Sequence, residues 1–467
     1  MIPLTLREIA TAVHGSLVAV PDPDAVVVGP VVADSRVVGD GGLFVALVGD
    51  HADGHDFAAE AFAAGAVAVL SARPVGGPAI VVDDVLLALG RLARAVVDRL
   101  PGLTVVAVTG SAGKTSTKDL LAQVLDGLGP TVAPSGSFNN ELGLPLTVLS
   151  VDAGTRFLVL EMGARGEGHI AYLCGVAPPD VAVVLMVGAA HVGEFGSIAA
   201  IADAKAEIVT ALAPEGQAVL NADDRAVRAM ASSTSAPVTW FGTAPDADVR
   251  ATDVHTEPTG RAAFVLSTAE GRAAVSLQLV GEHHVANALA AAAVATHFGA
   301  TVQQVADALS RAVPRSRWRM EVVERADGVT VINDAYNASP ESVHAALKTL
   351  AAMGQGRRTW AVLGEMRELG EASTVEHERV GRLAVRLDID RLVVVGAAAE
   401  PIYLAACLDG SGGEKPVLVP DPDAAVALLR RQVRPGDVVL VKAARAVGLE
   451  RVASALLEGS APAEGQR

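Results

Sequence analysis

The sequence predicts an α/β protein built from three domains, and three observations support this. The chain has 467 residues, which is about three domains of ordinary length. From residue 103 onward, β-like apolar runs alternate with helical patterns, as in parallel sheets. Pro101-Gly102 and the stretch near Pro314 interrupt the pattern. We therefore expect domains at 1–100, 101–313 and 314–458, followed by a disordered tail at 459–467.

Each domain has its own sequence of elements. The first contains the short apolar runs VVVGPVVAD, GLFVAL, AVAVL and AIVV, with helical patterns near 57–64 and at 85–99. The second contains LTVVAVT, a helix with apolar residues at 3.6-residue spacing, RFLVLE, DVAVVLMV, a helix at 198–212, QAVLN, VTWFG, a meander of short strands at 246–280 and an alanine-rich helix at 283–298. In the third, VTVIN, TWAVLG, RLVVVG, PVLVP and DVVLV alternate with helices in a doubly wound, Rossmann-like order.

Charge and cysteine content exclude several classes of protein. The net charge of −16 argues against nucleic acid or an anionic membrane as a partner. No apolar run reaches the roughly 18 residues of a membrane span, and the start of the chain lacks the basic residues of a signal peptide. Cys174 and Cys407 form neither a disulfide framework nor a zinc-binding spacing, so we expect a cytoplasmic protein.

A candidate phosphate-binding loop follows the run LTVVAVT. The loop TGSAGKTS places strand, glycine turn and helix in the order that a phosphate loop requires, in a short form with no glycine at 108. Its expected nucleotide-binding residues are Gly110, Ser111, Ala112, Gly113, Lys114, Thr115 and Ser116. Lys114 would neutralise the β- and γ-phosphates and Thr115 would bind Mg²⁺. The alternative interpretation is a tight turn with an exposed lysine.

Polar residues at the ends of later strands suggest a metal site. RFLVLE ends in Glu161, and His191 lies in the loop after DVAVVLMV. A carboxylate and an imidazole at this edge of the sheet are plausible Mg²⁺ ligands. On its own, His191 is more typical of a polar loop residue than of a metal ligand, and Asp223 and Asp224 are expected to form a turn and a helix cap.

Lys205 lies on the apolar face of the helix IADAKAEIVTAL, between Ile201 and Ile208. The pattern alone favours a lysine whose stem packs at the edge of the core and whose ammonium reaches solvent. The chain has only six lysines, so a lysine in a candidate site is less easily explained by chance.

Several motifs in the same order resemble the Mur ligases, ATP-dependent enzymes that extend the peptide of a peptidoglycan precursor. They are TGSAGKTST, SFNNELGLPLTVL, LEMGARGEGHI, IADAKAEI and HHVANALAAAA. DSR, GLFVAL, DGHDF, NDAYNASPES and LGEMRELG are most similar to the branch that adds D-alanyl-D-alanine. Two loops depart from that pattern, since Glu365 stands at a usual aspartate and Ala443-Ala444 replaces glycine-serine before Arg445.

The resemblance implies an ATP- and Mg²⁺-dependent reaction. A carboxylate of UDP-N-acetylmuramoyl-tripeptide would be converted to an acyl phosphate, which the amine of D-alanyl-D-alanine attacks. It also implies a UDP-substrate domain at 1–100, an ATP-binding domain at 101–313 and closure of the third domain near Pro314. Lys114, Lys205, His191 and Glu161 would be catalytic, with Thr115, Glu161, His191 and a carbamylated Lys205 as metal ligands.

The resemblance further assigns binding roles to residues across the chain. Asn287 would meet adenine, Arg319 the ATP phosphates and Asp334 the ribose. The substrate-binding residues would be Ser35 and Arg36 for the uridine diphosphate, Asn139 and Asn140 for the muramoyl-peptide, and Tyr336 and Asn337 for the dipeptide. Arg319 is also one of three neighbouring arginines, so a surface position is the alternative.

Three other functions stay open from the sequence. These are a Mur-type ligase that adds a single amino acid, folylpolyglutamate synthase, and a P-loop regulatory NTPase. The first hundred residues argue against folylpolyglutamate synthase, and a regulatory NTPase would leave the third domain without a role. We expect a monomer, and the sequence leaves the third residue of the tripeptide undetermined between diaminopimelate and lysine.

Overall fold

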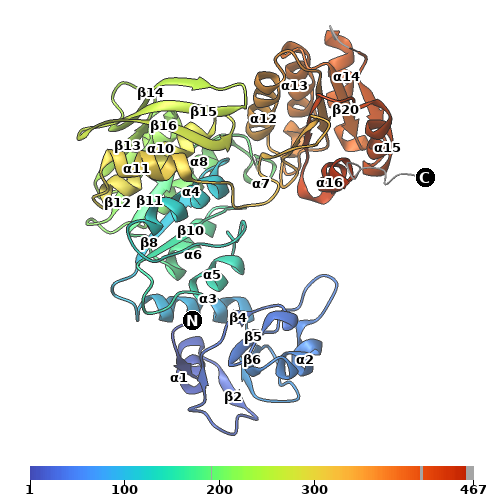
Figure 1. Cartoon of the computed structure of the whole chain (residues 1–467). Helices are drawn as coiled ribbons and strands as arrows, with labels where there is room; N and C mark the ends of the chain where they lie inside the picture. The colour runs from blue at the N-terminus through green and yellow to red at the C-terminus, as the bar shows by residue number, and fades with distance from the viewer. Residues whose placement is uncertain (191, 411–413, 459–467) are drawn as a thin grey trace.

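The computed structural model describes residues 1–190, 192–410 and 414–458. It contains three α/β units arranged along the chain, with the first unit in contact with the second, and the second with the third (Figure 1). The predicted three-part α/β fold is confirmed, whereas the domain limits stay predictions. The expected disorder of the tail at 459–467 lies outside the described residues.

The first unit is built on a small sheet of five strands in the order β2-β7-β6-β5-β4. All neighbours in it are parallel except β2 and β7. Its strands are β2 (Ser16–Val18), β4 (Val31–Val32), β5 (Gly42–Val45), β6 (Ala66–Ser71) and β7 (Ala79–Val81), and a separate pair is formed by β1 (Leu4–Thr5) and β3 (Val26–Val27). Its helices are α1 (Leu6–Val13), which a Thr5–Glu8 capping box starts, α2 (Ala58–Ala63) and α3 (Val85–Val97).

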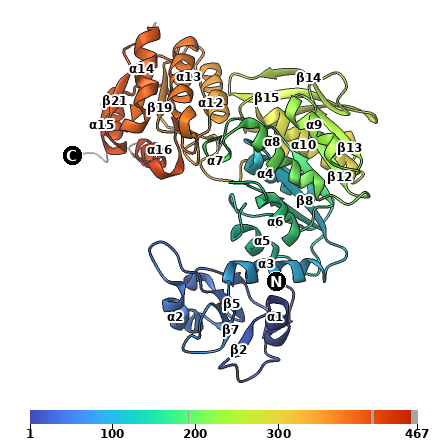
Figure 2. The same cartoon turned by 180° about the vertical axis from the view of Figure 1, so that it is seen from behind.

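Helix α3 joins the first unit to the second. Leu89 and Leu92 of α3 are fully buried in one core that also contains Ile9 of α1 and Leu158 of the central sheet. In both views α3 lies between the first sheet and the central unit (Figure 2). The position of the first unit is therefore fixed by apolar packing along this helix.

The central unit is built on a nine-stranded sheet in the order β16-β15-β14-β13-β12-β11-β8-β10-β9. Neighbours are parallel from β9 to β14 and antiparallel from β14 to β16. Its strands are β8 (Thr104–Thr109), β9 (Thr131–Val132), β10 (Phe157–Glu161), β11 (Val181–Val184), β12 (Gln217–Asn221), β13 (Val238–Gly242), β14 (Val249–Thr256), β15 (Arg261–Thr268) and β16 (Gly271–Val280).

Alternate residues of β8 face two different cores, as a parallel strand covered on both faces requires. Val105 and Ala107 join the core under α3, α5 (Gly143–Val148), α6 (His169–Val176) and α8 (Ile198–Thr210). Val106 and Val108 join the core under α4 (Lys114–Asp126), α10 (His284–His297) and α11 (Val302–Arg311). The short helices α7 (Val192–Phe195) and α9 (Arg225–Ala229) complete the unit, and Asp224 caps α9 as expected.

The predicted meander of short strands at 246–280 is wrong in strand length. The structure has three long strands there, of 8, 8 and 10 residues, that extend the central sheet. Buried and exposed residues alternate along β16, because its inner face packs on α11 while the other face meets solvent.

The third unit is built on a six-stranded sheet in the order β17-β18-β22-β19-β20-β21, parallel except for β17. Its strands are β17 (Glu321–Glu324), β18 (Thr330–Asn333), β19 (Thr359–Leu363), β20 (Arg391–Val395), β21 (Val417–Val419) and β22 (Val438–Lys442). One face is covered by α12 (Pro340–Met353), α13 (Ser373–Arg386) and α14 (Glu400–Asp409), and the other by α15 (Pro422–Gln432) and α16 (Glu450–Glu458).

None of the helices in the described ranges combines the length and the apolar character needed to cross a membrane.

The shared core around α3 gives a first prediction. Leu89→Ala should lower the free energy of unfolding by about 2–5 kcal/mol, because Leu89 is fully buried between the two units. The matched control is Leu87→Ala on the same helix, since Leu87 is 46% exposed and should change stability by no more than about 0.5 kcal/mol. Equal effects in urea unfolding would contradict the shared core.

Candidate active site

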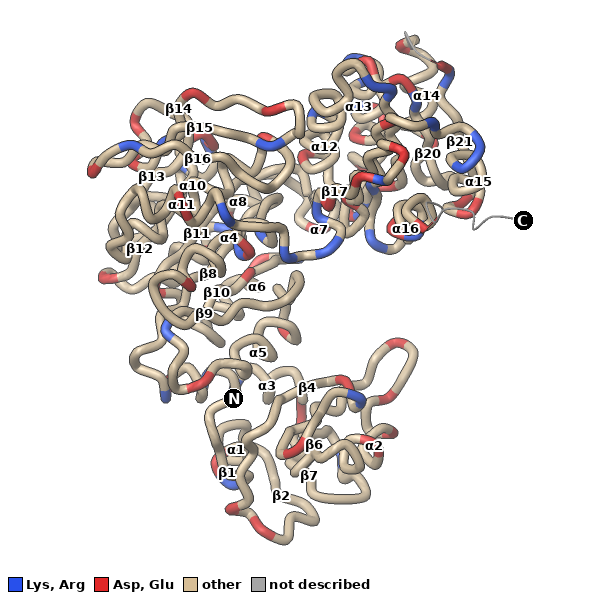
Figure 3. Tube along the Cα trace, viewed as in Figure 1, with Lys and Arg blue, Asp and Glu red and all other residues tan. Residues whose placement is uncertain are grey.

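The carboxyl ends of the central and third sheets face one cleft of about 770 Å³. Loops after β8 and β10 form one wall, and loops after β18, β19 and β22 form the other. Basic residues lie along the segment that joins the central and third units (Figure 3). The predicted site residues that line the cleft are Ser111, Ala112, Gly113, Lys114, Thr115, Ser116, Asn139, Asn140, Glu161, Lys205, Arg319, Tyr336 and Asn337.

The predicted phosphate loop forms a turn between β8 and α4. Gly113 has a φ of +85°, and an added Cβ would lie 2.5 Å from Oδ1 of Asn287, so only glycine fits. Gly113 is also the N-cap of α4, where no side chain accepts a hydrogen bond from the first turn. Backbone N–H groups at the start of α4 are therefore free for an anion.

Lys114 follows directly and lies half-buried in the wall of the cleft. Its Nζ donates a hydrogen bond to the carbonyl oxygen of Gly110 at 2.7 Å. Desolvation lowers the pKa of Lys114, the nearby Glu161 opposes this, and Arg319 lowers the pKa further. A poorly solvated cation at a phosphate loop favours binding of an anionic ligand.

The carboxylate of Glu161, at the end of β10, connects three segments of the site. It accepts hydrogen bonds from Oγ1 of Thr115 at 2.9 Å, Oγ of Ser137 at 2.8 Å and Nδ2 of Asn139 at 2.7 Å. Glu161 is only 1% exposed, so these three hydrogen bonds replace the water that its buried carboxylate lacks. Thr115 and Glu161 present hard oxygen atoms of the kind that Mg²⁺ prefers, and they fit a metal held beside phosphates.

Lys205 projects from α8 into the same cleft and is only 4% exposed. Burial lowers its pKa from 10.5 to about 7, and the nearby Lys114 contributes to the shift. The alternative of an ammonium that reaches solvent is therefore not what the structure shows. A large fraction of Lys205 is neutral near pH 7, which is the form that reacts with CO₂.

Arg319 extends from the linker between the units to the phosphate loop. Its Nη2 donates to Oγ1 of Thr115 at 3.1 Å, and its guanidinium lies 4.2 Å from the ring centroid of Tyr336. Residues more than 200 positions apart thus meet at the phosphate loop.

Other predicted residues lie away from the cleft surface. Asp334 is buried and its carboxylate accepts from Nζ of Lys442 at 2.6 Å and from the backbone N–H of Met320 at 3.1 Å. Asn287 is buried behind Gly113, with its amide 3.2 Å from Nδ1 of His284. Their proposed contacts to ribose and adenine stay predictions.

The predicted uridine diphosphate residues are in the first unit, apart from the cleft. Ser35 is buried in a short 3₁₀ turn and donates to Glu60 at 3.3 Å, whereas the exposed Arg36 pairs with Asp34 at 2.7 Å. His191, the predicted metal ligand, lies outside the described residues. Within the described ranges no group of three or more His, Cys, Asp or Glu side chains could hold a metal by itself.

Sequence reasoning missed several residues that the fold brings to the site. Ser137 binds Glu161, and Arg367 and Arg445 line the cleft from the third unit. Glu341, at the start of α12, accepts a hydrogen bond from the backbone N–H of Ala189 across the two units. Arg367 and Arg445 each follow the end of a predicted strand, which is the signal that could have identified them.

Fold and cleft together define a P-loop α/β protein whose site is shared by two units. The family models described as Mur ligase middle domain, Mur ligase glutamate ligase domain and Mur ligase family catalytic domain match residues 108–295, 318–445 and 28–97. The chain belongs to the Mur ligase family.

Individual relatives match over nearly the whole chain. A UDP-N-acetylmuramoyl-tripeptide--D-alanyl-D-alanine ligase of Mycobacterium tuberculosis is 51% identical, covering 98% of both chains, and that of Escherichia coli K12 is 36% identical, covering 98% of this chain and 99% of its own. Among solved structures, MurF from Acinetobacter baumannii has a TM-score of 0.87 at 32% identity, covering 98% of this chain and 99% of its own. MurF ligase from Thermotoga maritima in complex with ADP has a TM-score of 0.79 at 34% identity, covering 93% and 99%.

The burial of Lys205 predicts an unusual pH dependence of stability. Between about pH 7 and 10.5 the folded state binds fewer protons at Lys205 than the unfolded state, so this residue makes the protein less stable as the pH falls through that range. In bicarbonate-free buffer at pH 7, Lys205→Met should therefore raise the free energy of unfolding by roughly 2–4 kcal/mol.

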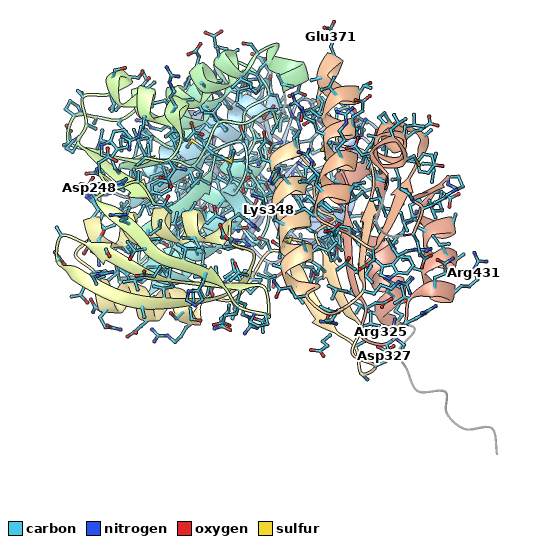
Figure 4. The ribbon with its side chains drawn as sticks, turned by 90° about the horizontal axis from the view of Figure 1, so that it is seen from above. Asp248, Arg325, Asp327, Lys348, Glu371 and Arg431 are labelled. Atoms are coloured by element: carbon cyan, nitrogen blue, oxygen red, sulfur yellow. The ribbon has the colours of Figure 1, made fainter. Side chains whose placement is uncertain are left out.

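The control is Lys348→Met, since Lys348 is an exposed residue of α12 (Figure 4). It should leave both the stability and its pH slope unchanged within about 0.5 kcal/mol. If the wild type and Lys205→Met lost stability in parallel from pH 10 to pH 7, the desolvation of Lys205 would be refuted.

Proposed function

We propose that this protein is an ATP-dependent ligase that joins D-alanyl-D-alanine to UDP-N-acetylmuramoyl-tripeptide. The observation on which this depends is the cleft where Lys114, Lys205 and Glu161 of the central unit face Arg319 and Asn337 near the third unit. A phosphate loop that faces a second parallel sheet can hold a nucleotide and an acceptor at once.

The curated relatives support the substrate assignment. Those at 51% and 36% identity are named for the addition of D-alanyl-D-alanine to UDP-N-acetylmuramoyl-tripeptide, and they match 98% of this chain. The ADP complex of the Thermotoga maritima relative supports ATP as the nucleotide. These similarities favour the dipeptide-adding reaction over the addition of a single amino acid, and a synthetic role over a regulatory NTPase.

The residues of the cleft fit ATP and Mg²⁺. ATP supplies the phosphoryl group that activates the tripeptide carboxylate as an acyl phosphate, and Mg²⁺ reduces the charge repulsion between the anions. The free N–H groups at the start of α4 and the ammonium of Lys114 would hold phosphate oxygens. Thr115 and Glu161 would hold the metal, and His191 is a further proposed ligand outside the described residues.

The protein's own groups favour the reaction mainly by charge and position. Lys114 and Arg319 bring positive charge to a site that must hold two polyanions. Asn139 is fixed by its hydrogen bond to Glu161, so its neighbour Asn140 is held at the same wall to contact the muramoyl-peptide. Tyr336 and Asn337, on the opposite wall, would contact the dipeptide.

Closure of the two units would protect the activated carboxylate from water. Two hydrogen bonds join the segment after β11 to the third unit. The backbone N–H of Ala189 donates to the carboxylate of Glu341, and the backbone N–H of Gly193 in α7 donates to the carbonyl oxygen of Glu368 at 3.0 Å. These contacts hold the walls of the cleft together. We further propose that the protein is a monomer and that it is cytoplasmic. The two free cysteines and the expected use of ATP support the cytoplasm.

The proposal predicts that phosphate release requires both substrates. Lys114→Ala should lower turnover at least about 1,000-fold while the folded structure is kept, because the lysine serves the phosphates and not a core. Phosphate release is measured with UDP-N-acetylmuramoyl-tripeptide and D-alanyl-D-alanine together and with each omitted, and Lys348→Ala is the control. Near-normal release by Lys114→Ala, or release by the wild type without either substrate, would refute the assignment.

A second prediction concerns carbamylation of Lys205. Since burial lowers the pKa of this amine to about 7, part of it is neutral near pH 7, and CO₂ can add to the neutral form with release of a proton to give a carboxylate-like ligand for a second Mg²⁺. Lys205→Ala should lose roughly 100-fold or more in turnover, with partial recovery in formate or acetate. Wild-type protein kept in bicarbonate should gain the mass of one CO₂ on Lys205, and the gain should fall below pH 7.

The outcome that would contradict carbamylation is specific to Lys205. Full activity of Lys205→Ala, or an equal mass gain on the exposed Lys348, would show that the buried amine has no special reactivity.

A further inference from the structure

The acceptor of the proposed reaction brings a charge for which the site described so far has no partner. A dipeptide must present its free amine to the activated carboxyl group, and its other end is a carboxylate. A carboxylate that leaves water for a cleft needs a cation or several hydrogen-bond donors. Lys114 and Arg319 lie at the phosphate loop. Arg165 lines the cleft from the loop after β10, so the candidate cations on the opposite wall are the arginines of the third unit.

Three arginines from residue 314 onward line the cleft: Arg319, Arg367 and Arg445. Arg319 is engaged with Thr115 at the phosphate loop. Arg367 and Arg445 are about equally exposed, at 57% and 50% of their side chains, but the ion pair of Arg367 with Glu365 is long, at 3.5 Å. Arg445 differs from both in the way that it is fixed.

The guanidinium of Arg445 is oriented before any ligand binds. Its Cζ lies 4.2 Å from the ring centroid of Trp318, and its Nη1 pairs with Oε1 of Glu450 at 2.7 Å. Among the described residues, Nε and Nη2 have no hydrogen-bond acceptor. The free edge formed by these two donors matches the two oxygens of a carboxylate.

Arg445 lines the same cleft as Lys205 and Glu161 of the central unit. Arg445 follows β22, which lies between β18 and β19 in the sheet. The loop after the neighbouring strand β18 contains Tyr336 and Asn337. Trp318, which supports Arg445, is the neighbour of Arg319, which contacts the phosphate loop. A short peptide anchored at Arg445 would therefore extend along the cleft toward Lys205 and Glu161.

We propose that Arg445 binds the terminal carboxylate of the dipeptide acceptor and thereby sets its direction in the cleft. The inference rests on the proposed function and deepens it. Trp318 and Glu450 are positioning residues that hold the guanidinium. Because binding is then tied to a free carboxylate, the site selects acceptors that end in one and discriminates against amides of the same length.

The test compares D-alanyl-D-alanine with its C-terminal amide in phosphate release by the full chain. Wild type should prefer the free acid, and Arg445→Ala should raise the KM for D-alanyl-D-alanine roughly 10- to 100-fold and abolish the preference. The KM values for ATP and the nucleotide-peptide should stay unchanged, which also shows that the variant is folded. Arg445→Lys keeps the charge without the paired donors and should keep part of the preference.

The matched control is Arg431→Ala, since Arg431 points away from the molecule on the outer side of the third unit (Figure 4). Its preference for the acid should equal that of the wild type. An unchanged preference in Arg445→Ala, or its loss in Arg367→Ala alone, would overturn the assignment to Arg445. Absence of dipeptide-dependent turnover in the wild type would instead refute the proposed function.

Discussion

The buried carboxylate of Glu161 is the constraint on which the geometry of the site depends. It binds the side chains of Thr115, Ser137 and Asn139, and so joins the start of α4, the loop before α5 and the end of β10. A buried carboxylate is stable only when its hydrogen bonds are made, so these three segments keep one arrangement. Arg319 reaches Thr115 and extends the same network to the linker.

Helix α4, which begins at the phosphate loop, is hydrogen-bonded to the linker between the units. Gln123 exchanges two hydrogen bonds of 3.0 Å with the backbone of Val313, and Asp119 accepts from the N–H of Ser316 at 3.0 Å. Lys118 is buried beside Asp119 and donates to the carbonyl of Pro134 at 2.7 Å. The linker on both sides of Pro314 is thus anchored to the helix that begins at the phosphate loop, and closure near Pro314 stays a prediction.

Three of the six lysines of the chain, Lys114, Lys205 and Lys442, lie at or beneath the cleft. Lys114, Lys205 and Lys442 have pKa values lowered mainly by desolvation, and Asp334 partly offsets that cost for Lys442. Lys442 also donates to the carbonyl of Asn337 at 2.9 Å, so it fixes a loop that lines the cleft. Poorly solvated cations bind anions strongly, which is the property that a reaction between polyanionic substrates requires.

The sequence by itself determined the α/β class, the strand ends and the residues that follow them. Lys114, Thr115 and Glu161 could be predicted to lie at the site because a glycine turn and a strand end are local signals, and the structure brings all three into the cleft. Only the tertiary structure shows that Lys442 donates a hydrogen bond to the carboxylate of Asp334, 108 positions away in the chain. Only the tertiary structure shows that the ring of Trp318 packs against the guanidinium of Arg445. Local periodicity specifies which face of an element is buried. Which side chains meet across two separate sheets depends on how those sheets pack, and contacts between distant residues leave no pattern in either segment.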